Sequence, residues 1–475
     1  MANRISGHHV SPGMDRRDFL RAAALTPLAT TFAAPAPDWR GLHRALTGKL
    51  VRPGDAGYDV AKRLFNPVWD RISPAGVAYC ATPADVSACL TFAHRSDLAV
   101  TPRSGGHSFA GWSTTKGLVV DVSKMNGVSY AHGRATVGAG ASLIEVYDKL
   151  ADHGVSIPAG TCPSVGIGGL TLGGGFGVVS RKYGLTCDTL ESVRIVTADG
   201  RLLTCDATHH ADLYWACRGG GGGNVGVAVG YTFRTHPARN VTVFFLHWQW
   251  ERASAAVKAW QSWASTAPDG LWSTLHLKRE NGSLDVQIGG LFLGGAQECE
   301  RLLAPLVSRI GPVSTRYVKV RSYRAAMRIM ASCSTTARCV EPRAVFNAKS
   351  HLAYRELTAE GIFTLVAGVA REGGHAVLLD ALGGRIGRVA PDATAFPHRE
   401  ALYNILYYSG GSDRYWLDRL HTEMNPHFGD HAYVNCIDPG LPNWRQAYYG
   451  GNAPRLAAVK STYDPTRLFD LPQGY

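Results

Sequence analysis

Two nucleophilic side chains, a histidine and a cysteine, stand in separate glycine-rich stretches of this chain. His107 lies in the stretch TPRSGGHSFAG (101–111), directly after a β-prone run. Glycines leave the backbone N–H groups accessible and let a ligand approach the main chain closely, so this loop suits a diphosphate whose charge Arg103 complements. Taken alone, a hairpin turn with a surface histidine explains the loop equally well.

The cysteine, Cys162, lies in the second stretch, AGTCPSVGIGGLTLGGGFGVVSRKYGL (159–185). Glycine recurs there at positions 166, 168, 169, 173, 174, 175 and 177. Such a density of glycine is costly in conformational entropy unless the backbone must come close to another group. The two stretches share one arrangement, in which a β-prone run leads into glycine-rich backbone beside a single nucleophile.

The two stretches together resemble those of FAD-linked oxidases of the berberine-bridge-enzyme type, within the vanillyl-alcohol-oxidase (PCMH-type) superfamily. The resemblance implies FAD bound bicovalently, through His107 to the flavin 8α-methyl carbon and through Cys162 to flavin C6. A G-x-G-x-x-G match near Gly168 lacks an acidic residue at the ribose-binding distance, which argues against NAD. The residues expected to bind FAD are His107, Cys162, Arg103, Ser104, Gly105, Gly106, Ser108, Val165, Gly166, Gly168, Gly169, Leu172, Gly173, Gly174, Gly175, Gly177, Val227, Tyr449 and Asn452.

The C-terminal stretch NWRQAYYGGNAPRLAAVKSTYDPTRLFDLPQ resembles the terminal motif of the same family. The resemblance implies that Tyr448 abstracts the substrate proton. A strand here would send Tyr448 and Tyr449 to opposite faces, so that only one of them meets the substrate, and Asn452 is expected to cap the helix that follows. A surface helix explains the apolar spacing after Asn452, but it does not require the tyrosines and glycines before it.

One position departs from the plant relatives. In the stretch FPHREALYNILYYSG, Ile405 stands where those relatives often carry a glutamate base. Tyr403 and Tyr407 share the face of Ile405 by the two-residue period of a strand, which predicts an aromatic wall at the site and a second tyrosine hydroxyl as a candidate catalytic group in place of the carboxylate. A core-facing strand explains both tyrosines equally well. The change points towards alcohol oxidation, with a phenolate whose pKa must be lowered from its ordinary value of about 10.

The resemblance therefore implies an oxidase that removes hydride from a CH–OH group, with O₂ returning the flavin to its oxidised form and yielding H₂O₂. Val165, three places after the cysteine, occupies a position that the family associates with oxygen access. The expected substrate is a bulky alcohol or sugar. Flavin-dependent ring closure, oxidative or redox-neutral, is the alternative, and a non-enzymatic flavin-binding protein is a weaker one. The sequence predicts no oligomeric state.

Composition excludes several other classes of protein. The 475 residues are 45% hydrophobic, enough for large cores, and the formal charge of +12 comes from scattered Lys and Arg rather than from a basic block. We therefore expect no nucleic-acid partner. Ten cysteines without a C-x-x-C pair argue against a zinc site or a disulfide framework, and no metal is expected. Only Cys333 and Cys339 are close enough in sequence to suggest a disulfide bridge.

The order of segments predicts an α+β protein with a two-part FAD-binding domain and a substrate domain. Residues 1–38 contain paired arginines before a short apolar run, which predicts a twin-arginine export signal and an extracellular or cell-envelope protein; chance arginines in a leader are the alternative. The apolar run is too short to span a bilayer, so no stable membrane insertion is expected. Residues 39–239 form the expected PCMH-type FAD-binding domain, residues 240–429 a substrate domain built on a mostly antiparallel sheet covered by helices, and residues 430–475 a return to the FAD domain.

Overall fold

The computed structural model describes residues 37–333, 339, 342–411 and 414–475. The twin-arginine segment at the N-terminus, residues 1–36, lies outside the described residues, and export therefore stays a prediction. Residues 37–475 form a single compact unit, so the predicted domain boundaries within them also stay predictions.

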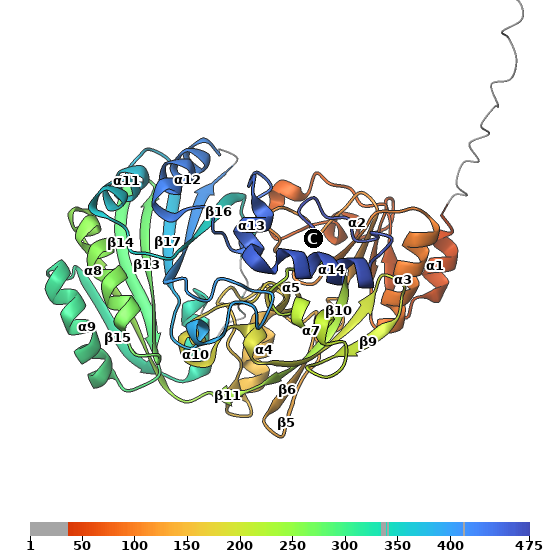
Figure 1. The fold of residues 1–475 in the computed structure, drawn as a ribbon, viewed down its shortest axis with the longest axis horizontal. Helices are drawn as coiled ribbons and strands as arrows, with labels where there is room; N and C mark the ends of the chain where they lie inside the picture. Colours follow the sequence, from red (N-terminus) through yellow and green to blue (C-terminus); the bar gives the residue numbers. More distant parts are fainter. Residues whose placement is uncertain (1–36, 334–338, 340–341, 412–413) are drawn as a thin grey trace, which may run out of the picture. The chain divides into compact units, whose positions relative to one another are not determined.

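Two sheets carry the N-terminal half of this unit (Figure 1). The first has the order β1-β2-β4-β3, with β2, β4 and β3 parallel and β1 antiparallel to β2. The second is antiparallel, with the order β5-β6-β10-β8-β9. Their strands are β1 Lys49–Val51, β2 Gly76–Tyr79, β3 Val100–Arg103, β4 Leu118–Asp121, β5 Val128–Ala131, β6 Arg134–Gly138, β8 Leu190–Thr197, β9 Leu202–Cys205 and β10 Gly226–Arg234, and the short strands β7 Val155–Ser156 and β11 His236–Pro237 form a separate pair.

Two helices of this half begin with capping boxes. Thr82 caps α3 with a capping box that includes Asp85, and Pro83 occupies the first turn, where it has no N–H to leave unpaired. Ser142 forms a second capping box ahead of α4. The helices are α1 Trp39–Ala45, α2 Tyr58–Ala61, α3 Pro83–Arg95, α4 Leu143–Ala151, α5 Ile167–Leu172, α6 Ser180–Tyr183 and α7 Ala211–Ala216.

A large antiparallel sheet follows, with the strand order β15-β12-β14-β13-β17-β18-β16. Its members are β12 Val241–Trp248, β13 Leu271–Glu280, β14 Ser283–Phe292, β15 Thr315–Arg321, β16 Phe346–Ala353, β17 His375–Ala381 and β18 Tyr403–Gly410. The predicted antiparallel sheet and the α+β class are confirmed.

Helices α8, α9, α11 and α12 cover one face of this sheet (Figure 1). Trp260 of α8 is completely buried against it and donates from Nε1 to Ser273 Oγ of β13 at 3.0 Å. Because successive side chains of a strand point to opposite faces, Trp272 and Thr274 of β13 face away from these helices. The helices of this half are α8 Ala253–Thr266, α9 Ala296–Ile310, α10 Tyr323–Met330, α11 Ala359–Val369 and α12 Tyr415–Phe428.

The C-terminal segment returns to the N-terminal half through α13 Trp444–Tyr449 and α14 Ala453–Tyr463. The buried ammonium of Lys460 holds this contact, because it donates to Asn224 O at 2.6 Å, to Phe469 O at 2.7 Å and to the carboxylate of Asp464 at 2.6 Å. The strand predicted at Tyr448 is wrong, because helix α13 begins at Trp444 and includes both tyrosines.

Cys333 and Cys339 form a disulfide, which confirms the pairing that their spacing suggests. Among the described residues, no helix is both long and apolar enough to cross a membrane. The part of the chain that the structure describes also contains no group of three or more His, Cys, Asp or Glu side chains arranged to hold a metal ion.

Candidate active site

One cavity of about 880 Å³ collects most of the residues that the sequence singles out. Its first wall consists of the two glycine-rich loops, the segment 221–228 and the segment 433–437. Its second wall is the helix-free face of β13, β17 and β18. We call these the loop wall and the sheet wall. The volume lies in the upper part of the range of roughly 300–1,000 Å³ that small-molecule sites occupy.

The two glycine-rich loops contact each other through their backbones. A Cβ on Gly105 would overlap the backbone nitrogen of Gly166, and one on Gly166 would overlap the hydroxyl of Ser104. Gly106 has a φ of +70°, a conformation that favours glycine. These glycines therefore let the loops pack together, and the predicted proximity of the two nucleophiles follows from that contact.

His107 and Cys162 both line this cavity. The imidazole of His107 stacks on Phe65 with a centroid separation of 4.0 Å, and its Nε2 lies 2.9 Å from Ser164 Oγ. Burial lowers the pKa of His107 to about 4, so the ring is neutral and nucleophilic at pH 7. Cys162 is partly exposed to the cavity and belongs to no disulfide.

Arg103 lines the cavity, but Asp121 offsets most of its charge. Its Nε lies 2.5 Å from Asp121 Oδ2, and its Nη2 donates to Ala61 O at 2.7 Å. Of the three guanidinium nitrogens of Arg103, Nη1 alone makes no hydrogen bond to the described residues. The guanidinium therefore ties β3 to β4, and we expect at most one hydrogen bond from it to a ligand rather than a net positive charge.

The remaining predicted cofactor residues divide into two groups. Ser104, Gly105, Gly106, Ser108, Val165, Gly166, Gly168, Gly169, Leu172, Val227 and Tyr449 line the cavity. Gly173, Gly174, Gly175, Gly177 and Asn452 do not.

The four glycines of the second group serve packing and chain reversal. Gly174 and Gly175 have φ values of +109° and +75° in the turn after α5, and a Cβ on Gly173 or Gly177 would overlap Asn435 or Ala159 O. Their contact with the cofactor stays a prediction, and their place outside the cavity lining does not favour it.

Asn452 also has a structural role. It stands at the N-cap position of α14, but its side chain makes no cap hydrogen bond. Its amide instead donates to Pro391 O at 2.8 Å and to Thr394 O at 3.1 Å, which fixes the loop before the FPHR segment. The predicted side-chain cap is therefore wrong.

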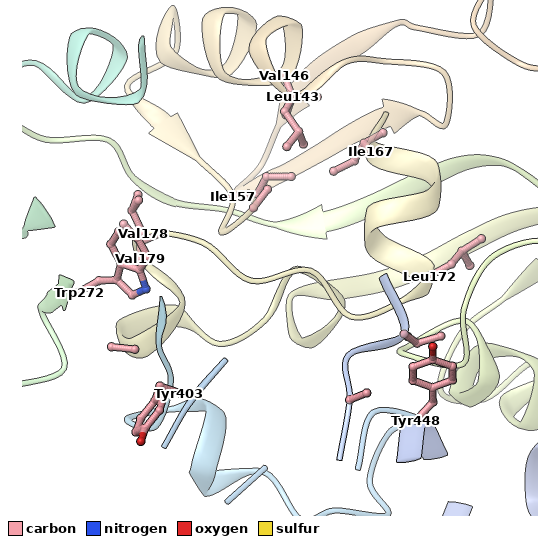
Figure 2. Close-up of a cluster of buried hydrophobic side chains, with 14 of the residues drawn as sticks. Leu143, Val146, Ile157, Ile167, Leu172, Val178, Val179, Trp272, Tyr403 and Tyr448 are labelled. Carbon is pink, nitrogen blue, oxygen red and sulfur yellow. The ribbon is translucent and has the colours of Figure 1, made fainter. Parts of the chain in front are cut away.

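Tyr403 and Tyr407 do not reach the cavity. Tyr403 donates to Gln261 at 3.1 Å, and the hydroxyl of Tyr407 lies 3.1 Å from Nδ1 of His351, both in the buried layer between sheet and helices. Both tyrosines share a face of β18 with Ile405, as the two-residue period of a strand predicts. That face packs against the helices and does not line the cavity. Figure 2 shows Tyr403 among the buried hydrophobic side chains. Leu406 and Tyr408 line the cavity instead, so the predicted wall of Tyr403 and Tyr407 is wrong.

Tyr448 is 1% exposed and is not among the residues that line the cavity. Its hydroxyl accepts a hydrogen bond from the backbone N–H of Asp438 at 2.8 Å, and burial raises its pKa above the ordinary tyrosine value. Figure 2 shows its ring among the buried side chains. The role of Tyr448 as proton acceptor stays a prediction, and neither its position nor its pKa favours it. Tyr449 lines the cavity and donates to Gly220 O at 3.0 Å.

The sheet wall contains polar residues that sequence reasoning missed. Thr274 and His276 of β13 and Asp380 of β17 line the cavity. Burial raises the pKa of Asp380 to about 6, although the neighbouring side chains of Thr274 and Asn404 lower it in part. A single aspartate in the apolar run HAVLLDALGG (375–384) was the signal that could have revealed both the strand and the site.

Aromatic side chains form a further part of the lining, beside His107. Phe109 and Phe346 meet edge to face at 5.4 Å, and Tyr408 lies 5.7 Å from Phe346. Phe65, Phe109, Phe346 and Tyr408 all line the cavity. Flat apolar surface and polar strand residues therefore face the same space.

A flavin fits the loop wall. A Cβ on Gly169 would meet no atom within 4 Å, so this glycine leaves room on the cavity side, and two nucleophiles stand in the same wall. His107 and Cys162 would tether the ring system, and Ser104, Gly106 and the segment 221–223 would lie along the rest of the cofactor. The flavin, when bound, supplies a two-electron acceptor for hydride.

Comparison with known proteins agrees with this arrangement. Residues 74–206 match the family described as FAD binding domain, and residues 432–474 match the family described as berberine and berberine like. These matches and the cavity define an FAD-linked oxidoreductase.

The particular family follows from whole-chain similarity. An uncharacterized FAD-linked oxidoreductase of Bacillus subtilis, YgaK, is 34% identical over 448 residues, which is 90% of this chain and 97% of that protein. Physcomitrella patens BBE-like 1 has a similar structure, with a TM-score of 0.86, 28% identity and coverage of 92% of this chain and 98% of that one. The chain belongs to the berberine-bridge-enzyme-like family of FAD-linked oxidoreductases.

A chitooligosaccharide oxidase of Gibberella zeae is a further relative. It is 29% identical over 432 residues, which is 84% of this chain and 87% of that protein. A solved structure of chitooligosaccharide oxidase superposes with a TM-score of 0.83 at 26% identity and covers 91% of this chain and 98% of that one.

Proposed function

We propose that this protein is an exported oxidase that removes two electrons from a hydroxyl-bearing carbon of a sugar or another bulky alcohol, with FAD held covalently by His107 and Cys162 and with O₂ as the final acceptor. The observation that carries the proposal is that the loop wall and the sheet wall face the same cavity. Two nucleophiles stand in the loop wall, and hydroxyl-binding groups stand in the sheet wall.

The chain's own residues have separable tasks in this reaction. Covalent bonds from His107 and Cys162 hold the cofactor, while the aromatic rings of Phe109, Phe346 and Tyr408 offer apolar faces to the C–H side of a ring-shaped substrate. Polar atoms of β13 and β17 bind its hydroxyl groups. A proton acceptor in the cavity must take the hydroxyl proton as hydride leaves the same carbon.

A saccharide substrate is favoured by this combination of surfaces. Sugars present an apolar face of C–H groups and an edge of hydroxyls, which correspond to the aromatic and polar parts of the lining. The relationship to chitooligosaccharide oxidase supports the same substrate class. Val165 lines the cavity. The family resemblance associates this position with oxygen access, which supports O₂ as acceptor.

The experiment is an anaerobic titration of the purified holoprotein with a panel of mono- and oligosaccharides and of benzylic and secondary alcohols, followed by the visible flavin spectrum. We expect saccharides to bleach the flavin and readmitted air to restore the colour with one H₂O₂ per turnover. Photoreduction serves as a control that the flavin is competent. A flavin that light reduces but that no alcohol reduces would contradict the proposal.

A further inference from the structure

The face of the large sheet that lines the cavity continues beyond the cavity, from β13 across β14 and β12 to the edge strand β15. Helices α8, α9, α11 and α12 cover the opposite face (Figure 1). Residues paired across antiparallel strands lie on the same face, so the register shows which side chains extend the sheet wall. Neighbouring strands lie about 4.7–4.9 Å apart, so this extension spans about 14 Å from β13 to β15.

One row of residues on this extension is aromatic. Thr274 in the cavity is the register partner of Gly289 in β14. Gly289 is paired in turn with Phe245 of β12, and Phe245 with Tyr317 of β15. A Cβ on Gly289 would lie 2.8 Å from the Phe245 ring, so the glycine leaves space for the ring to lie against β14. Phe245 and Tyr317 are half-buried, and their ring centroids lie 5.9 Å apart. We call these two residues the aromatic row.

A polar row lies beside it, two residues further along the strands. His276 in the cavity is paired with Gln287 of β14, and Gln287 with His247 of β12. Nε2 of Gln287 lies 2.9 Å from Nε2 of His247, and Nδ1 of His247 lies 3.1 Å from Asp285 Oδ1. Because an amide nitrogen is a donor, Nε2 of His247 accepts and its Nδ1–H donates to Asp285. The side chain of His247 is 32% exposed, so a ligand can reach this row.

Both rows begin at polar groups of β13 that the protein leaves unsatisfied. Nε1 of Trp272, Oγ1 of Thr274 and Nδ1 of His276 are buried and make no hydrogen bond of standard geometry to the described residues. All three side chains line the cavity. A buried polar group without a partner is destabilising. Three of them at alternate positions of one strand indicate a ligand with several hydroxyl groups.

Helix α10 flanks the aromatic row on the side opposite the polar row. It begins at Tyr323, shortly after Arg321 at the end of β15, and contacts both β12 and β15. Its last residue, Met330, lines the cavity. Arg321 donates from Nε to the hydroxyl of Tyr317 at 3.1 Å, which fixes the phenol ring. The aromatic row therefore lies between α10 and the polar row.

We propose that the aromatic row and the polar row bind the distal units of an oligosaccharide whose terminal sugar lies in the cavity. This inference rests on the proposed function, which places a sugar at the cavity end. The C–H face of each sugar packs on Phe245 and Tyr317, while its hydroxyl edge meets Gln287 and His247. The rows extend farther from the cavity than a single sugar ring, so only a chain occupies both. They supply affinity and take no part in hydride transfer.

The test is calorimetric titration of the anaerobic, photoreduced holoprotein, because a reduced flavin accepts no hydride and binding is then measured without turnover. The probes are the disaccharide and the tetrasaccharide of two series, β-linked glucose and β-linked N-acetylglucosamine. We expect the tetrasaccharide of at least one series to bind about tenfold more tightly than its disaccharide, as a few additional hydrogen bonds and ring contacts would produce.

Variants on β12 and β15 assign this preference to the two rows. Tyr317→Ala and His247→Ala should each reduce it to about threefold, and the double variant should abolish it, with the Kd of the disaccharide unchanged throughout. Tyr317→Phe keeps the ring and should keep most of the preference. Arg316→Ala is the matched control, because Arg316 lies on the other face of β15 and pairs with Glu300 of α9. Thermal unfolding and visible flavin content show that each variant is folded and loaded.

The outcomes separate this inference from the proposed function. Equal affinity of the wild type for both chain lengths would overturn the inference, and so would Tyr317→Ala if it weakened disaccharide and tetrasaccharide binding alike. Flavin reduction by an alcohol would leave the proposed function standing in both cases. If the tetrasaccharide binds as expected but no alcohol reduces the flavin, the proposed oxidation fails and the binding surface stands.

Discussion

The two walls of the cavity are built on different principles. The loop wall is made of backbone: its glycines let two loops pack in direct contact and bring His107 and Cys162 to one space. The sheet wall is made of side chains on three paired strands, and its chemistry depends on which residues the register places side by side. A change in the loop wall should therefore act on folding and flavin binding, whereas a change in the sheet wall should act on the substrate.

The largest effect is expected from breaking the charge pair beneath the loop wall. Arg103→Met leaves the buried carboxylate of Asp121 without its cation, and losing one partner of a buried pair costs about 3–5 kcal/mol. We expect low yield and weak flavin retention, measured by denaturant unfolding and the visible spectrum. The double variant Arg103→Met/Asp121→Leu should recover most of the stability, and a double variant as unstable as the single one would speak against the pair as the cause.

Gly105→Ala should have the next largest effect, because its methyl group would overlap the backbone of Gly166, which cannot rotate away as a side chain can. Overpacking of this kind costs about 3 kcal/mol at the upper end of its usual range. The expected result is a destabilised, flavin-poor protein, measured by thermal unfolding and the ratio of visible to ultraviolet absorbance. Normal flavin content in this variant would show that the loop contact is dispensable.

The glycine and tyrosine motifs of the loop wall and the C-terminus could be recognised from sequence because they lie within short stretches. His107, Gly105 and Gly106 form one such stretch, and Cys162 and Gly166 form another. The roles of Gly173 and Gly177 could not be separated from those of Gly168 and Gly169, since a requirement for packing and a requirement for a ligand both select glycine.

The sheet wall could not be predicted in the same way. Thr274, Asp380 and Asn404 lie far apart in sequence, and only the pairing of β13, β17 and β18 makes them neighbours. The period of β18 correctly placed Tyr403, Ile405 and Tyr407 on one face, but both faces of this strand are covered. A strand buried on two sides gives no apolar–polar contrast that would identify the cavity face.

Asp380→Asn should stabilise the protein at neutral pH. Because the folded-state pKa of Asp380 is raised from 3.8 to about 6, ionisation is less favourable in the folded chain, and this group destabilises the fold above pH 6 and not below pH 3.8. The difference of about 2 pKa units corresponds to about 1–3 kcal/mol, allowing for water in the cavity. Thermal unfolding should show a higher Tm for D380N than for the wild type at pH 8, and this difference should disappear by pH 4. An equal difference in Tm at both pH values would contradict the assigned pKa.

Gly169→Ala is the matched control for Gly105→Ala in the loop wall. Residue 169 is helical and has space around it, so alanine should stabilise the flavin-free protein by up to about 1 kcal/mol. The methyl group points into space that the flavin would need, so flavin content should fall. Protein produced under riboflavin limitation and then loaded with FAD gives both quantities, and full loading would show that the flavin does not lie against Gly169.

Tyr403→Phe should have the smallest effect. It removes the hydrogen bond to Gln261 behind the sheet wall, which contributes about 1 kcal/mol, and leaves the cavity lining unchanged. We expect a slightly lower Tm with kcat and KM as in the wild type. A loss of kcat greater than tenfold would show that the helix-covered face of β18 influences the reaction.

The central claim is that two nucleophiles in one wall hold one flavin, and the intact mass of the acid-denatured protein tests it most directly. The wild-type chain should carry the mass of one FAD, His107→Ala and Cys162→Ala should each retain it through the remaining bond, and the double variant should lose it. A wild-type mass equal to that of the polypeptide alone, with the yellow chromophore in the supernatant, would contradict covalent attachment.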